Sequence, residues 1–247
     1  LVCFFSLDPV PPRAAVSLSH RATANHITMT RNQGKKNMQM KSLKLTFKRK
    51  DRGRAGTRVL NLSKRNATVS NLPVRVAEEL GVLTPSATEA RVFVNGRFLG
   101  VFTNLEQTDE GFLRRRDLMP GEIYNGDFQS TRAIRHLNVL EDPYAWTKNA
   151  RQNTIDKKDF GHLEQFLGAL NGVGITRHLD FRSMLDWDAT VAHIGYSMLL
   201  NTHHQDNVHN QKWYLDPLTG RFVPIAWDAF VGRYYGPGID FAGEFPK

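Results

Sequence analysis

The sequence lacks several features that would assign it to a class at once. It holds one cysteine, Cys3, in 247 residues, which excludes an intrachain disulfide and says little about the compartment. No run of 18 or more apolar residues occurs, so no membrane-spanning helix is predicted. Neither GxGxxG nor GxxxxGK[ST], the glycine-rich patterns that cradle phosphates, is present. Residues 31–36 (RNQGKK) offer only a weak substitute for such a phosphate-covering turn.

Positive charge is plentiful but confined to one segment. The chain carries a net charge of +9, whereas residues 31–67 alone contain 13 Lys or Arg and one acid, a local charge of +12. The rest of the chain therefore sums to −3. The segment could bind a nucleic acid or another polyanion, but Phe47 is its only aromatic residue, so a solvated strand face is favoured.

Both ends of the chain predict a fragment. Residues 1–25 are rich in Pro, Ser and Ala, and we interpret them as a tail or linker that could include the remnant of a secretion signal. The protein would then be exported or placed at the cell surface, and otherwise it would be cytoplasmic or associated with a coat. The chain ends at Lys247 soon after its most polar segment, which predicts an incomplete C-terminal part.

The first half of the chain predicts strands and one helix. Residues 41–48 alternate strictly, with Leu43, Leu45 and Phe47 on one face. Further strands are predicted at 26–31 and 59–62, and a helix over 72–80 with Asn71 as its cap. The dipeptide Asn95-Gly96 is typical of a tight hairpin turn and predicts paired strands at 90–94 and 98–105.

The second half predicts helices followed by a short hairpin. Helices are expected at 110–116, 160–170 and 181–200, the last with Asp180 as cap. Its expected buried stripe is Met184, Leu185, Trp187, Val191, Ile194, Met198 and Leu199. Strands follow at 212–215 and 221–225. This order predicts a two-lobed α+β fold, with a β-rich N-terminal lobe at about 26–107 and a mainly helical C-terminal lobe at about 108–247.

The densest chemistry lies between residues 201 and 233. Asp206 and Asn210 are four residues apart in a polar loop after a long helix, and Asp228 follows the second strand of a hairpin. Phosphoryl transfer needs an acid near the attacking hydroxyl and hard oxygen ligands for Mg²⁺, and this layout suits both. Asp and Asn also stitch loops in many proteins, so a purely structural role stays open.

Other residues are weaker candidates. Lys44 lies on a strand ahead of a helix that carries Glu78 and Glu79, where a phosphate-binding lysine and its acidic partner would fit, although an exposed strand lysine is common. Glu106 and Gln107 end the predicted hairpin, where a kinase reads adenine. His203, His204 and His209 are too loosely spaced to favour zinc, and His209 is expected to fix the loop by hydrogen bonding.

Five stretches resemble one family, the CotH kinase-like proteins. They are residues 41–47 (KSLKLTF), 92–107 (VFVNGRFLGVFTNLEQ), 112–115 (FLRR), 206–210 (DNVHN) and 224–228 (PIAWD). The resemblance implies an atypical protein kinase fold that transfers phosphate from ATP, with Mg²⁺ or Mn²⁺, to Ser residues of proteins. It also implies that Asp206 is the catalytic acid.

The same resemblance implies the remaining roles. Asp228 would be a metal ligand, Asn210 a second one, and Lys44 the phosphate contact, with Lys41 as its rival. Two positions depart from the family pattern, because Phe230 stands where a second acid is usual and Asn125 where a lysine is usual. These departures leave a second hypothesis open, an inactive kinase-like scaffold that works as a coat-assembly or cell-surface binding protein.

Overall fold

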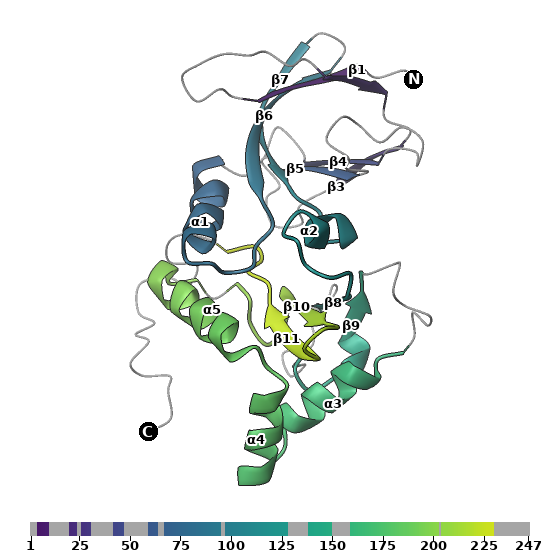
Figure 1. Ribbon diagram of the computed structural model, residues 1–247. Helices are drawn as coiled ribbons and strands as arrows, with labels where there is room; N and C mark the ends of the chain where they lie inside the picture. Colours follow the sequence, from purple (N-terminus) through teal and green to yellow (C-terminus); the bar gives the residue numbers. More distant parts are fainter. Residues whose placement is uncertain are drawn as a thin grey trace. The chain divides into compact units, whose positions relative to one another are not determined.

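The chain divides into two compact units (Figure 1). The computed structural model describes residues 4–9, 20–23, 26–30, 42–46, 59–63, 67–94, 97–127, 138–149, 159–202 and 204–229. Unit 1 comprises Leu1–Val74 and Pro85–Asp117, and unit 2 comprises Arg75–Thr84 and Leu118–Lys247. With two antiparallel sheets and five α-helices in its described part, the protein is a mixed α+β protein, as the sequence predicts.

Unit 1 is built on a seven-stranded sheet of order β2-β1-β6-β7-β5-β4-β3, in which every pairing is antiparallel. Its strands are β1 (Phe4–Pro9), β2 (His20–Thr23), β3 (His26–Thr30), β4 (Ser42–Thr46), β5 (Val59–Ser63), β6 (Ala87–Val94) and β7 (Arg97–Leu105). Leu43 and Leu45 of β4 are buried and Lys44 between them is exposed, which confirms the predicted alternation. The hairpin of β6 and β7 is confirmed too, although its turn, Asn95-Gly96, lies outside the described residues.

Two expectations for this part of the chain need correction. Residues 1–25 contain β1 and β2, where a tail is predicted, because pairing with β6 supplies backbone partners to a segment without apolar periodicity. The helix α1 (Ala67–Glu79) starts earlier than expected, so Asn71 lies inside it and not at its cap. The Asn71 amide instead donates to Glu89 over 3.4 Å. The short helix α2 (Glu110–Arg114) is capped by Asp109.

Unit 2 combines a four-stranded antiparallel sheet with three helices. The sheet order is β11-β10-β8-β9, from strands β8 (Glu122–Gly126), β9 (Trp146–Lys148), β10 (Gln211–Asp216) and β11 (Arg221–Pro224). The helices are α3 (Gly161–Leu170), α4 (Ile175–Ser183) and α5 (Trp187–Leu200). The bounds of α3, β10 and β11 lie close to the predicted ones.

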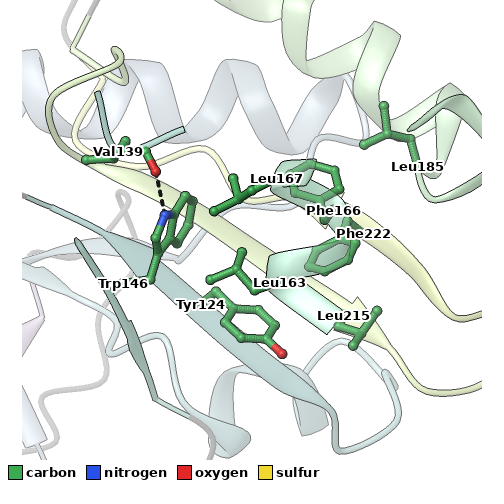
Figure 2. Close-up of a cluster of buried hydrophobic side chains, with 9 residues drawn as sticks. All are labelled: Tyr124, Val139, Trp146, Leu163, Phe166, Leu167, Leu185, Leu215 and Phe222. Carbon is green, nitrogen blue, oxygen red and sulfur yellow. Dashed lines mark hydrogen bonds between the residues drawn. The ribbon is translucent and has the colours of Figure 1, made fainter. Parts of the chain in front are cut away.

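An aromatic-rich core joins one face of this sheet to α3 (Figure 2). Its nine buried members are Tyr124, Val139, Trp146, Leu163, Phe166, Leu167, Leu185, Leu215 and Phe222. The Trp146 indole N–H donates to the Val139 carbonyl over 2.6 Å, which satisfies the polar end of the ring inside this core (Figure 2). A side chain at Gly126 would collide with that indole, so the strand needs glycine there.

The predicted helix over 181–200 is wrong in two respects. Residues 184–186 interrupt it because Phe222 of β11 exchanges backbone hydrogen bonds with Met184 and Asp186, and Asp186 caps α5 in place of Asp180. The expected stripe is also mostly exposed, since its α5 members are 41–66% exposed: Trp187, Val191, Ile194, Met198 and Leu199. The residues that α5 buries are Thr190, Tyr196 and Leu200. Among the described residues, none of the helices has the length and apolar character needed to cross a bilayer.

Candidate functional site

The polar loop between α5 and β10 brings the predicted Asp206 and Asn210 close to Asp228, all within unit 2. Helix α5 ends at Asn201, whose left-handed backbone (φ 50°) turns the chain into the loop. Strand β10 then starts at Gln211, and β11 returns the chain to Asp228. The residues that the sequence marks as catalytic acid and metal ligands therefore meet at one end of the β10–β11 hairpin.

His204 joins Asn210 to Asp228. Its buried ring places Nδ1 2.9 Å from the Asp228 carboxylate Oδ2 and 3.0 Å from the Asp228 carbonyl oxygen. Both partners are acceptors, so Nδ1 carries the proton and donates it. The Asn210 amide N–H donates to the His204 carbonyl over 3.0 Å and lies 3.1 Å from the ring Nδ1. The Asn210 side-chain oxygen is left to accept from a ligand.

Asp206 shapes its own loop. Its Oδ1 accepts the backbone N–H groups of Val208 and His209 at 2.8 and 2.9 Å, the pattern of an Asx turn. His209 Nδ1 also lies 2.8 Å from Oδ1, without the geometry of a hydrogen bond, so that contact is electrostatic. The stitching role that the sequence leaves open for Asp206 is therefore present, and it uses one of the two carboxylate oxygens.

Gln205, which the sequence analysis does not single out, fastens the loop to the end of β11. Its side-chain N–H groups donate to the carbonyls of Asn210 and Ile225 at 3.1 and 2.9 Å. Its side-chain oxygen accepts from the Trp227 backbone N–H at 3.0 Å and from His193 Nε2 at 3.1 Å. Burial lowers the pKa of His193, against the raising effect of the hydrogen bond that its ring donates to Gln205, so a neutral ring makes this contact. No sequence pattern marks this side chain.

Two of the candidate residues hold unusual backbone conformations. Asn210 and Asp228 have φ values of 64° and 50°, in the left-handed region that few residues other than glycine adopt. Asn and Asp enter this region more readily than most residues, and such conformations persist where surrounding contacts hold them, often at functional sites. Here the contacts are those of His204 and Gln205.

A buried lysine lies beside this group. Lys212 of β10 is 8% exposed and lies directly across from Asn125 of β8, and its ammonium donates to the Asn125 side-chain oxygen. The ammonium also lies 4.3 Å from the centre of the Trp227 ring. Burial lowers the pKa of Lys212 to about 8, against the raising effect of the Asp127 charge. A lysine therefore lies beside position 125, on the neighbouring strand.

Asp127 is a further acid that the sequence analysis does not identify. Its pKa is raised, first by burial and then by the negative charges of Asp206 and Asp228, while His209 and Lys212 lower it. The charges of Asp206 and Asp228 therefore both reach the Asp127 carboxyl at this end of the sheet. The signal in the sequence is faint, because Asp127 only follows a strand whose end carries the polar residue Asn125.

The oxygen donors of the loop fit Mg²⁺ or Mn²⁺. The Asp228 carboxylate and the Asn210 side-chain oxygen are hard ligands, and Mg²⁺ is commonly held by one or two carboxylates plus phosphates and water. Within the described residues no group of three or more His, Cys, Asp or Glu side chains is arranged to hold a metal ion. A metal at this place would thus depend on its phosphate ligand as well as on the protein.

The residues that the sequence predicts to contact the nucleotide are Lys44, Glu106 and Gln107, and they lie in unit 1, not in the polar loop of unit 2. Lys44 is exposed on β4. The buried Glu106 carboxylate contacts Arg115 Nε at 2.5 Å, Arg116 at 2.9 Å and the Ser86 backbone N–H at 2.8 Å. Burial would raise the pKa of Glu106, but these partners together lower it. The Gln107 side chain accepts from Asn61 over 3.2 Å.

The remaining predicted residues add little to the site. Glu78 and Glu79, the expected partners of Lys44, are both exposed. Lys41, Phe230, His203 and residues 31–36 lie outside the described residues, as does most of the basic segment 31–67.

The fold is that of a mixed α+β protein with a polar loop in unit 2, and the sequence assigns its family. The chain belongs to the CotH kinase protein family, which matches residues 30–230, so the resemblance found in the sequence is confirmed. It is similar to the inner spore coat protein H of Bacillus subtilis (strain 168), with 29% identity over 162 residues. The match covers 61% of this chain and 42% of that relative, so the chain spans less than half of the relative's length.

Proposed function

We propose that this chain is part of a coat-related protein kinase that uses ATP and Mg²⁺ or Mn²⁺ to phosphorylate Ser residues. The observation that carries the proposal is the placement of Asp206, Asn210 and Asp228 at one end of the β10–β11 hairpin in unit 2. There His204 and Gln205 link Asn210 to the segment that carries Asp228. A coat protein as acceptor is suggested by the relative, whose name is inner spore coat protein H.

The proposed reaction gives each residue one task. A serine hydroxyl of the acceptor attacks the γ-phosphorus of ATP, the bond from that phosphorus to the β-phosphate oxygen breaks, and ADP leaves. The Asp206 carboxylate orients the hydroxyl and takes its proton through the oxygen that does not stitch the loop. Asp228 and Asn210 hold the metal ion, which when bound neutralises charge on the phosphates.

Contacts to the rest of the nucleotide are proposed for unit 1. Lys44, being exposed, is free of a structural role on β4 and is proposed as a phosphate contact. Because the side chains of Glu106 and Gln107 are engaged by Arg115, Arg116 and Asn61, adenine would be read by the backbone of these two residues.

A second candidate is a kinase-like scaffold without turnover, which binds other coat or surface proteins. The observation in its favour is that Asn125 replaces the lysine of the family pattern, and Phe230 its second acid. On this alternative the loop would still fold and could keep some affinity for nucleotide.

The test is transfer of labelled phosphate from ATP, with Mg²⁺ or Mn²⁺, by wild type and Asp228→Asn. Asparagine accepts the left-handed backbone of position 228 and keeps an oxygen for His204, so the fold should persist. We expect transfer to fall by about a hundredfold or more, because a charged ligand of the metal is lost. The control is Asp180→Asn, the same chemical change at an exposed position of α4.

The outcomes separate the two candidates. Label in wild type and Asp180→Asn but not in Asp228→Asn supports the kinase. Equal label in all three removes Asp228 from the reaction. If wild type transfers nothing to itself or to coat proteins, yet ATP with Mg²⁺ raises its melting temperature, the scaffold becomes the better description.

A further inference from the structure

Lys212 is a buried cation without a carboxylate partner. Side chains of a strand alternate between the two faces of its sheet, so Lys212 and its cross-strand neighbour Asn125 lie on the face opposite to Tyr124 and Trp213. The aromatic core covers the face of Tyr124. Within the described part of the chain, no Asp or Glu forms an ion pair with the Lys212 ammonium.

The groups around the ammonium are half-buried, so solvent reaches them. Asn125, Asp127 and Trp227 are all partly exposed, whereas Lys212 itself is 8% exposed. A neutral amide oxygen and an aromatic face solvate the ammonium only partly, and an ammonium has three protons to donate. A buried charge is normally paired, so this one is suited to a ligand that brings the missing negative charge.

We infer that the Lys212 ammonium is an anion-binding group that contacts a phosphate oxygen of a polyphosphate bound beside Asp228. The identification of the polyphosphate as that of ATP rests on the proposed function. The contact is a charge-assisted hydrogen bond made inside unit 2. The ammonium lies over the ring of Trp227, the residue that directly precedes Asp228 in the chain.

The surrounding acids set a condition on the ligand. Asp127, Asp206 and Asp228 would repel a free polyphosphate, since all three carboxylates act on this end of the sheet. The ligand must therefore arrive as a complex with a divalent cation, in which the carboxylates face the cation and Lys212 faces the phosphate. Removal of the cation should abolish binding, and removal of the lysine charge should weaken it.

Calorimetric titration of the 247-residue chain with Mg·ATP and with Mg·tripolyphosphate tests this. Lys212→Met removes the charge and Lys212→Gln keeps a donor for Asn125, and both should weaken the two ligands about ten- to a hundredfold. Arg221→Met, which removes the same charge from an exposed position of β11, should change neither affinity. A chelator should remove the binding of tripolyphosphate by wild type.

Each outcome decides something. Wild-type affinity in both Lys212 variants overturns the inference, and so does a wild type that binds neither ligand. Unfolding of both variants also overturns it, because Lys212 would then be structural. Binding of Mg·tripolyphosphate but not Mg·ATP, lost in both variants, keeps the inference and removes the nucleotide from the proposed function.

Discussion

Strand β8 has a buried lysine on each side, and the two lysines are solvated differently. On the β9 side, the side chain of Lys148 is 2% exposed, and its ammonium lies 2.6 Å from the Glu122 carboxylate and over the ring of Tyr124. On the β10 side, Lys212 donates to the neutral Asn125 and lies over Trp227. Both residues are lysines on strands that flank β8, and both ammonium groups lie near an aromatic ring, whereas only Lys148 has a carboxylate in ion-pair contact.

The comparison separates a structural charge from a functional one. Lys148 and Glu122 neutralise each other beside the aromatic core, and the Tyr124 hydroxyl donates to the same carboxylate. Nothing is left for a ligand to supply there. Lys212, among the described residues, has no carboxylate in ion-pair contact and lies near Asp127, whose charge acts on it. Removing the first lysine should damage the fold, and removing the second should damage ligand binding alone.

The largest effect on stability is expected for Lys148→Met. It leaves the Glu122 carboxylate without its cation next to the core, and we expect the free energy of unfolding to fall by about 3 kcal/mol. Urea denaturation of the variant and wild type measures this. The double variant Glu122→Gln/Lys148→Met should recover part of the loss, because it leaves no charge behind. A loss below about 0.5 kcal/mol would mean that the Lys148–Glu122 ion pair contributes no more than an exposed one. The contrast with Lys212 would then disappear.

A smaller loss is expected for Gln205→Ala. The change removes the four hydrogen bonds that hold the loop to the end of β11, and unfolding should become easier by about 2 kcal/mol. Phosphate transfer should fall further than the loss of folded protein explains, because Asn210 and Asp228 lose their common anchor. Thermal denaturation and the transfer assay on the same samples give the two numbers.

Two variants sharpen that prediction. Gln205→Glu keeps the acceptor for Trp227 and His193 but cannot donate to the carbonyls of Asn210 and Ile225, so it should resemble Gln205→Ala and not wild type. Gln165→Ala, at an exposed position of α3, should leave both stability and transfer unchanged. If Gln205→Ala keeps full transfer activity, the loop is positioned by other contacts.

The sequence predicts the sheets better than it predicts what holds the site. Leu43, Lys44 and Leu45 take the faces that their alternation requires, because a half-buried strand allows only that arrangement. The pattern fails in α5, where Val191 and Met198 have core spacing and remain exposed. Apolar spacing identifies a helical face, but tertiary packing decides whether that face is covered.

The candidate site shows the same limit. Asp206, Asn210 and Asp228 can be named from their order along the chain, and His204 joins the last two in the structure. The anchor Gln205 and the acid Asp127 are set by contacts between segments about 20 and 80 residues apart, which no local pattern records. The sequence does contain a signal for Lys212. This lysine lies two residues before Tyr214, so the two side chains share one face of β10, and Tyr214 is buried.

The smallest effect, and the one of opposite sign, is expected for Lys212→Met. An ammonium that is buried without a carboxylate loses more hydration than an amide and an aromatic ring return, and replacement of such a charge by an apolar chain of similar length is often stabilising. We expect the free energy of unfolding at pH 7 to rise by about 1 kcal/mol, because the gain is partly offset by the partner that Asn125 loses. Urea denaturation of Lys212→Met, Lys148→Met and Arg221→Met in a metal-free buffer measures a gain, a loss and no change. A loss for Lys212→Met as large as that for Lys148→Met would show that both sides of β8 carry structural charges, and the site would then have to find its phosphate contact elsewhere.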